Sequence, residues 1–324
     1  MKHTRLWALN TGLVLGLGVL LLLGLAAGVH WYAPTPWLGS QLAQQILWTI
    51  RLPRVLCAAL VGALLAFSGQ LMQGLARNPI ADPAILGVNA GATLALMLGA
   101  LGGVALTVIN TLWLSLLGAA VTFVMVLGLA MRRGGLDILR FILGGTVLSS
   151  LITCLAYAAG LLTNSTSQFR NLLVGGFANA TPAQATVLLG AAAVIVIIAG
   201  CFHKELSLMV LDDATAASLG IDPNRVRLLA AALVVLCAGL AVAVAGNIGF
   251  VGLGVPQVIA YVHPDRFERN IAPTMLGGAC FMSAMDILAK TLTAPNELPL
   301  AALSAICGGA FLFAVISRPK GVRL

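Results

Sequence analysis

Residues 6–29 read LWALNTGLVLGLGVLLLLGLAAGV, an apolar run without a single charged residue. A helix needs about 20 apolar residues to cross the hydrocarbon core of a bilayer, so this run predicts a membrane span. Lys2 and Arg5 precede the run, as basic residues precede the apolar part of a signal peptide. That part is only about 7–15 residues long, and no convincing cleavage site follows here, so we interpret the run as a first span.

The rest of the chain has the same character. Of its 324 residues, 60% are hydrophobic and 9% are charged, whereas soluble domains have roughly 45–50% and about 25%. So few charges exclude a cytosolic enzyme, and so many apolar residues exclude a disordered chain. We predict an all-α polytopic membrane protein, a single transmembrane domain over residues 1–324 with ten membrane-spanning helices. The predicted spans are 6–29, 54–76, 84–103, 107–131, 138–162, 184–202, 227–246, 248–262, 271–293 and 299–317.

The basic residues predict the orientation of these spans. An even number of spans places both termini on one side, and with the termini inside, all but four of the 18 Lys and Arg residues lie at inner positions. The four at outer positions are Arg51, Arg54, Arg170 and Lys290. Because inner loops are enriched in Lys and Arg, we expect cytoplasmic termini. The net charge of +8 is then explained by the Lys and Arg residues of the inner loops, so it does not indicate nucleic acid as a partner. The outer loop after the first span carries Trp31, Trp37 and Trp48, as expected at a membrane interface.

Residue types that carry catalysis or bind metals are scarce and scattered. The six cysteines stand singly and the four histidines lack ligand spacing, so we predict no metal site. No lysine follows a glycine, which excludes the phosphate-binding motif GxxxxGK[ST]. A Ser/His/Asp set or a pair of catalytic carboxylates is also missing. We expect no enzyme activity and no cofactor in this chain, and ATP with Mg²⁺ would be bound by a separate ATPase subunit.

The stretch RNPIADP at residues 77–83 interrupts the apolar pattern. Its two prolines prevent a continuous helix, and the predicted topology puts the resulting turn at the inner face of the membrane. From the residues alone, a tight hairpin loop explains it as well as a functional site does.

The longest inner loop, residues 203–226, has the pattern of a short helix. Asp212 or Asp213 can cap the start of this helix, alanine-rich sequence continues it, and Gly220 suits its end. Such a helix could dock a cytoplasmic partner, although a plain connector remains the alternative.

Asp286 and Lys290 stand four residues apart inside a predicted span. Charges in a span are costly and mark either function or structural pairing, and this order suits an ion pair within one helix. The pair is therefore structural, or Asp286 is a proton site.

Six segments in order resemble the iron-siderophore, haem and cobalamin permease family of bacterial ABC importers. They are RLPR at 51–54, SGxxxQ at 68–73, RNPIADPxxLGVNAGA at 77–92, ASLGI at 217–221, AGNIGFVGLGVPQ at 245–257 and DxxAK…ELP at 286–299. The resemblance covers the chain from about residue 45 to its end. It implies a multi-pass permease of the bacterial cell membrane that pairs with a second copy or a close relative. It also implies two ATPase subunits on the inner face and an extracytoplasmic binding protein that delivers a metal chelate.

The resemblance also implies residue roles. It implies that Asp212, Asp213, Ser218, Leu219 and Gly220 couple the permease to the ATPase. It implies that Asn78, Pro79 and Ile80 form a cytoplasmic gate. It implies that the binding protein docks on Arg51, Arg54, Arg170 and Lys290. The sequence departs from the family at Gln257, where histidine is usual, at Ala260-Tyr261, which replace a basic residue, and at Lys290, where arginine is usual.

We expect the imported chelate to be an iron-siderophore, with haem and cobalamin as alternatives within the family. The competing hypothesis from another class is a proton-coupled secondary transporter that uses Asp286. A membrane-embedded enzyme is a third hypothesis, for which the chain offers no catalytic constellation.

Overall fold

The computed structural model describes residues 2–28, 31, 41–84, 87–132, 135–162, 172–209 and 223–316. Its long helices are α1 (Lys2–Ala26), α3 (Leu52–Ala76), α4 (Val88–Leu101), α5 (Val108–Ala130), α6 (Ile138–Leu162), α8 (Pro182–Cys201), α11 (Pro223–Ala245), α12 (Val251–Val262), α13 (Phe267–Thr291) and α14 (Leu300–Ile316). Short elements are α2 (Gln41–Ile46), a π-helical turn (Leu47–Arg51), α9 (His203–Leu208) and the strands β1 (Met131–Arg132) and β2 (Gly135–Leu136).

Each of the ten predicted spans coincides with one of the long helices. Seven helices within the described ranges are long and apolar enough to cross a membrane, whereas α4, α12 and α14 are shorter apolar helices. The chain is therefore an all-helical polytopic membrane protein, as predicted. The strands β1 and β2 were not predicted; they form a two-stranded antiparallel ribbon between α5 and α6.

The predicted outer loop around Trp48 is wrong, because the chain is helical there. Residues Gln41–Ala76 form one continuous apolar helical segment of 36 residues. The π-helical turn lies directly before Pro53, where the missing proline N–H interrupts the α-helical hydrogen-bond ladder. The proline thus changes the type of helix locally and does not end it.

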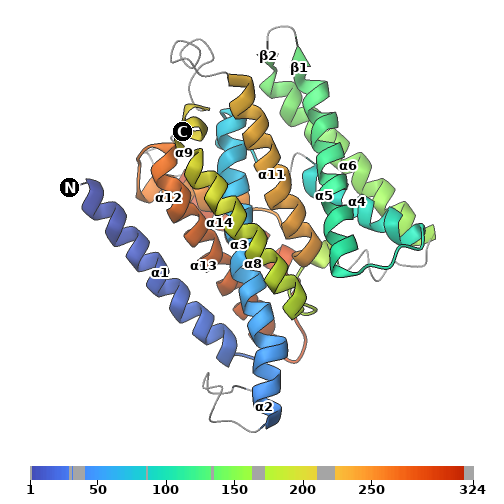
Figure 1. Cartoon of the computed structure of the whole chain (residues 1–324), viewed down its shortest axis with the longest axis vertical. Coiled ribbons are helices and arrows are strands. Elements are labelled where there is room, and N and C mark those ends of the chain that lie inside the picture. The colour runs from blue at the N-terminus through green and yellow to red at the C-terminus, as the bar shows by residue number, and fades with distance from the viewer. Residues whose placement is uncertain are drawn as a thin grey trace.

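The core of the molecule surrounds α3, which runs through the middle of the bundle (Figure 1). Nearly every side chain from Cys57 to Ala76 is buried, and α3 packs against α8, α11, α12 and α13. Two glycines allow the close approach of α3 and α13. A Cβ at Gly62 would overlap the backbone oxygen of Gly278 in α13, and a Cβ at Gly278 would overlap that of Gly62. Small residues serve this purpose in membrane bundles generally.

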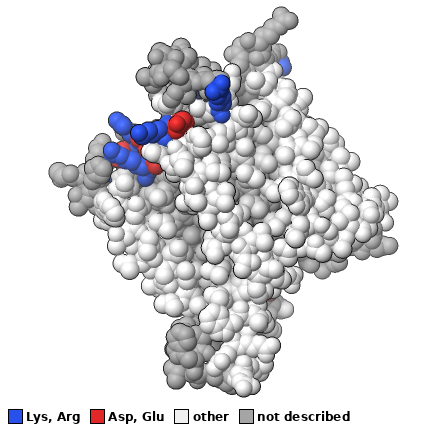
Figure 2. Space-filling model, viewed as in Figure 1, with Lys and Arg blue, Asp and Glu red and all other residues white. Residues whose placement is uncertain are grey.

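Charged side chains gather at one end of the molecule in Figure 2, around α9 and the turn between α12 and α13, while most of the visible surface is uncharged. We call this the α9 end. The opposite end, where α2 and the start of α3 lie (Figure 1), is called the α2 end. Described charged residues at the α9 end include Lys204, Arg266, Glu268 and Arg269. The uncharged surface between the two ends is the part suited to lipid.

Candidate functional site

Three polar features interrupt the apolar interior: a charge cluster at the α2 end, a turn between α3 and α4, and a cavity at the α9 end. In the charge cluster, Arg54 of α3 binds two carboxylates from distant parts of the chain. Its Nε donates to Asp286 Oδ1 at 2.9 Å, and its Nη1 and Nη2 donate to Glu297 Oε1 and Oε2 at 2.6 and 3.0 Å. The Asp286 side chain is 3% exposed and that of Glu297 is 38% exposed. Arg54 therefore has one buried and one surface partner.

The other two cations of the cluster bind the end of α1. Lys290 Nζ donates to the Gly24 carbonyl at 2.7 Å, and Arg51 Nη1 donates to the carbonyls of Leu25 and Ala26 at 2.7 Å each. The last carbonyls of a helix lack partners within the helix and carry partial negative charge, which favours cations there. Arg51 and Lys290 thus hold α1 against α3 and α13.

The predicted docking residues are therefore mostly turned inward. Arg51, Arg54 and Lys290 all have partners within the protein, and Arg170 lies outside the described residues. Asp286 and Lys290 lie 3.6 Å apart, as an i,i+4 ion pair does. Arg54 was not predicted as a partner of Asp286, because the two residues lie 232 positions apart in the sequence.

Besides the cavity at the α9 end, a cavity at the α2 end adjoins this charge cluster. It has a volume of about 530 Å³ and lies among the ends of α4 and α11, the start of α5 and the segments around residues 175 and 297. Glu297 and Leu298 form part of its wall, together with Gly175, Gly176 and Gly246. The surface partner of Arg54 thus also lines a cavity. We call this space the outer cavity.

The turn after α3 contains the predicted gate residues. Arg77 takes a left-handed conformation with φ 46° and ends the helix, and Asn78 Oδ1 accepts a hydrogen bond from the Ile80 N–H at 3.0 Å. Asn78 and Pro79 are half-buried, and Ile80 is 59% exposed. The turn therefore holds an apolar side chain outward at the α9 end of α3.

Asp82 fixes the other end of this turn. Its Oδ1 accepts the Ala84 N–H at 2.9 Å, and the Phe250 N–H at the start of α12 also donates to its carboxylate. Asp82 lies between α3 and α4, outside the spanning helices, and burial raises the pKa of its carboxyl to about 6 against the opposing effect of these N–H donors. The turn is thus tied to α12 through one buried acid.

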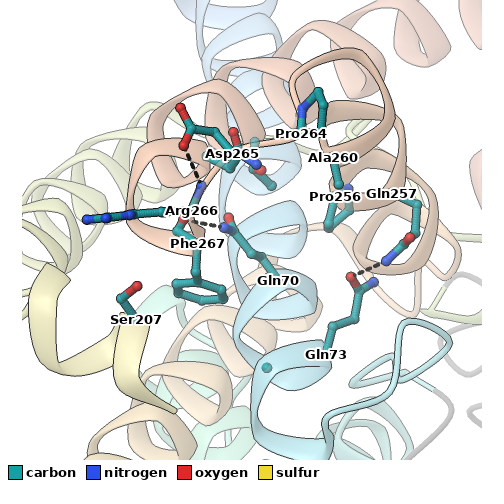
Figure 3. Close-up of a pocket in the computed structure, with 13 residues that line it drawn as sticks. Gln70, Gln73, Ser207, Pro256, Gln257, Ala260, Pro264, Asp265, Arg266 and Phe267 are labelled. Carbon is teal, nitrogen blue, oxygen red and sulfur yellow. Dashed lines mark hydrogen bonds between the residues drawn. The ribbon is translucent and has the colours of Figure 1, made fainter. Parts of the chain in front are cut away.

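Polar and apolar side chains together line the cavity at the α9 end. Its volume is about 530 Å³, and α3, α9, α12 and α13 surround it. Figure 3 shows Gln70 and Phe267 near its centre, Ser207 of α9 on one side, and the Gln73–Gln257 pair on the other. Gln257 Nε2 donates to Gln73 Oε1 at 2.7 Å. Gln257, which stands where the family usually has histidine, is therefore hydrogen-bonded to α3.

Two polar atoms of this cavity lack partners. Gln70 Nε2 donates to the Phe267 carbonyl at 3.0 Å, but Gln70 Oε1 and Thr274 Oγ1 are buried and have no hydrogen-bond partner among the described residues. Buried polar groups normally have a partner in protein or in ordered water. Such polar residues inside a membrane bundle mark a functional site by default.

The predicted coupling helix, Asp212–Gly220, lies outside the described residues. The described start of the same loop is anchored in the bundle. Leu206 of α9 is fully buried and Met209 is 6% exposed. A Cβ at Gly74 would lie 2.7 Å from Met209 Cε and 3.2 Å from Phe267 Cε2, so Met209 packs against α3 beside Phe267 of α13, where glycine leaves room. Movement of this loop would therefore act directly on those two helices.

The described part of the chain contains no group of three or more His, Cys, Asp or Glu residues placed to hold a metal ion.

Comparison with known proteins gives consistent results over most of the chain. The model of the FecCD transport family matches residues 16–318. The iron(3+)-hydroxamate import system permease protein FhuB of Bacillus subtilis is 32% identical over 313 residues, covering 95% of this chain and 82% of the relative. The hemin permease protein HmuU of Yersinia pestis is 35% identical over 285 residues (85% and 84%). The vitamin B12 import permease protein BtuC of Serratia proteamaculans is 33% identical over 315 residues (96% and 93%).

A solved structure agrees with the fold. A putative metal-chelate type ABC transporter, in an inward-facing conformation, superposes with a TM-score of 0.84 at 27% identity, over 95% of this chain and 98% of that one.

Proposed function

This chain belongs to the FecCD transport family, and from that membership we propose that it imports an iron-siderophore. It is a multi-pass permease of a bacterial ABC importer, a transmembrane component that catalyses no reaction itself. Such a permease works with an ATPase and a binding protein. We propose further that two copies, or this chain and a close relative, enclose the pathway and bind two ATPase subunits.

The observation that carries the proposal is the match of the family model to residues 16–318, nearly the whole chain. Relatives of similar identity are named for iron(3+)-hydroxamate, hemin and vitamin B12, so haem and cobalamin are the alternatives. The test is ATP-driven uptake into proteoliposomes that contain the permease, its ATPase and its binding protein. We expect uptake of a ferric hydroxamate siderophore. Uptake of haem or cobalamin alone would contradict the proposed substrate.

We propose that the α9 end faces the cytoplasm and that both termini lie there. The charges gathered at that end (Figure 2) support this orientation, because cytoplasmic loops are enriched in Lys and Arg. Labelling of Ser207→Cys from the cytoplasmic side and of Trp48→Cys from the outside tests it in a cysteine-free background. Labelling from the reverse sides would contradict it.

We propose that the inner loop, with Asp212, Asp213, Ser218, Leu219 and Gly220, couples the ATPase to the spans. The buried anchors Leu206 and Met209 support this role, since they connect the loop to α3 and α13. Gly220→Pro, or charge reversal at Asp213, should abolish ATP-driven uptake while the permease still inserts into the membrane. Normal uptake by both variants would refute the coupling role.

We propose that the turn at Asn78, Pro79 and Ile80 forms the cytoplasmic gate. The exposed Ile80 side chain supports this, because an apolar side chain held outward on a rigid turn can meet its copy in a partner permease. Ile80→Cys should therefore cross-link between copies in the closed state. Free reaction with bulky thiol reagents from the cytoplasm in every nucleotide state would contradict the assignment.

We propose that the binding protein docks at the α2 end, near Arg51, Arg54, Arg170 and Lys290. Charge pairs between binding partners speed association and weaken with salt, so Arg51→Glu with Arg54→Glu should slow docking and reduce its salt dependence. An unchanged rate and salt dependence would refute docking through these residues. Asp286 is bonded to Arg54 and lies beside Lys290, which supports a structural role for it over a proton carrier.

A further inference from the structure

We propose that Glu297 is an exchangeable partner of Arg54, displaced when an acidic side chain of the binding protein docks. The exchange frees the segment that closes one wall of the outer cavity, so that docking is transmitted to the pathway. The inference rests on the docking proposed above and names the residue that responds to it.

The two carboxylates on Arg54 differ in how firmly they are held. Asp286 lies in the middle of a helix, is 3% exposed and has Lys290 as a second cation at 3.6 Å. Glu297 lies in the segment between α13 and α14, is 38% exposed, and binds through both of its oxygens to one edge of the guanidinium. The edge that Glu297 occupies is therefore the more accessible one for an incoming group.

A carboxylate is the group that fits this edge. The Nη1 and Nη2 atoms present two parallel donors, the arrangement that carboxylates match with both oxygens. An acidic side chain from a partner would make the same two hydrogen bonds that Glu297 makes, so the exchange leaves Arg54 fully bonded. Because exposed ion pairs contribute little to stability, losing Glu297 from the pair does not unfold the site.

The net charge of the cluster determines which kind of partner is favoured. Arg51, Arg54 and Lys290 bring three positive charges against the two negative charges of Asp286 and Glu297. Departure of Glu297 leaves this corner more positive until the partner's carboxylate replaces it. The site therefore favours an acidic partner over a neutral or basic one.

Displacement of Glu297 has a local consequence. The segment after α13 is held by the Leu298 N–H, which donates to the Ala289 carbonyl at 2.9 Å, and by Thr293 Oγ1, which donates to the Asn296 carbonyl at 3.0 Å. Glu297 and Leu298 line the outer cavity, as do Gly175 and Gly246. Without the bond from Glu297 to Arg54, this wall keeps its local hydrogen bonds and the packing of Leu298 on the core. The part of the segment around Glu297 is then freer to move away from the cavity.

The test compares wild type with Glu297→Gln, which keeps the size of the side chain and removes the competing carboxylate. The permease is reconstituted in nanodiscs, and the probe is the purified extracytoplasmic binding protein of the same importer. We expect Glu297→Gln to bind the probe about 3–10-fold more tightly, since Arg54 no longer has an internal competitor. We also expect faster hydrogen exchange at the Leu298 amide in the absence of the probe. The matched control is Thr293→Ala, which loosens the same segment without changing its charge and should leave the affinity unchanged.

Equal affinities of wild type and Glu297→Gln, or weaker binding by the variant, would overturn the exchange. An unchanged Leu298 amide would overturn the release of the segment. Failure of the wild type to bind the probe would overturn the proposed docking together with the exchange, whereas normal wild-type binding with an unaffected Glu297→Gln would overturn the exchange alone. Glu297→Ala repeats the test with a variant that cannot hydrogen-bond to Arg54.

Discussion

Replacing Gly278 by alanine should separate α3 from α13 and destabilise the protein. A Cβ at this position would overlap the Gly62 carbonyl oxygen, lie 2.5 Å from Ala66 Cβ and lie 2.9 Å from the Gly62 carbonyl carbon. Two of these three neighbours are backbone atoms, so no side-chain rotation relieves the clash and the helices themselves must shift. Overpacking of this kind costs about 1–3 kcal/mol, and the backbone partners put Gly278 near the upper limit.

Helix propensity acts in the opposite direction. Alanine is favoured over glycine in a helix by about 1 kcal/mol, so the net effect of Gly278→Ala should be a loss of about 2 kcal/mol. The matched control is Gly128→Ala in α5, where an added Cβ has nothing within 4 Å. That variant gains propensity without a clash and should be up to about 1 kcal/mol more stable than wild type. The two substitutions should therefore differ by about 3 kcal/mol.

The assay is equilibrium unfolding in mixed micelles, followed by circular dichroism, with both variants measured beside wild type. Gly62→Ala should resemble Gly278→Ala, because each Cβ meets the carbonyl of the other residue. The double variant should lose less than the sum of the single losses, since one separation of the helices relieves both clashes. If Gly278→Ala were as stable as Gly128→Ala, the close approach of α3 and α13 would be refuted.

Three further predictions concern the polar features. Asp286→Asn should lower the free energy of unfolding by about 3–5 kcal/mol because it breaks a buried ion pair. Glu297→Gln should lower it by only about 0–1 kcal/mol, because Glu297 is exposed. Equal losses for the two variants would contradict the argument from burial. Folding raises the pKa of Asp82 to about 6 from an unfolded value of about 3.9. At pH values between these two, the folded state therefore binds more protons than the unfolded state. Wild-type stability should consequently fall as the pH rises from about 4 to 6. The thermal stability of Asp82→Asn should lack this component, and equal pH profiles would exclude it. Gln257→Leu should cost about 1–3 kcal/mol by leaving Gln73 Oε1 unpaired, and an unchanged melting temperature would show that water replaces the bond.

Most spans could be predicted from the sequence because their apolar runs are long enough to cross the bilayer, whereas the runs of α4, α12 and α14 form shorter helices. Residues 138–162 were predicted and the helix runs from Ile138 to Leu162. The helical start of the segment Gln41–Ala76 was missed, since Pro53 and neighbouring polar residues are typical of a loop. Apolar content alone does not reveal that a π-helical turn can accommodate the proline.

The charge cluster was only partly predictable. Asp286 and Lys290 share one helix, so their spacing revealed the pair. Arg54 and Glu297 reach the same place from other parts of the chain, and no local pattern connects them. A general rule could have found Arg54, because charges inside spans need partners and Arg54 begins a predicted span. The partnerless oxygen of Gln70 has no counterpart in the sequence pattern, since it depends on how three helices meet.

The contacts of α13 limit where the permease can change shape. It is tied to α3 at the α2 end by Asp286 and Arg54, in its middle by Gly278 against Gly62, and at the α9 end by the bond from Gln70 to the Phe267 carbonyl. Helices joined at both ends and in the middle move together, because sliding one along the other breaks an ion pair and a backbone contact at once. The helices α4, α5 and α6 form a second packed group, in which α6 packs chiefly on α4 and α5. We therefore expect relative movement during transport between these two groups, across the contacts that α11, which packs on α3, also makes with α4 and α5.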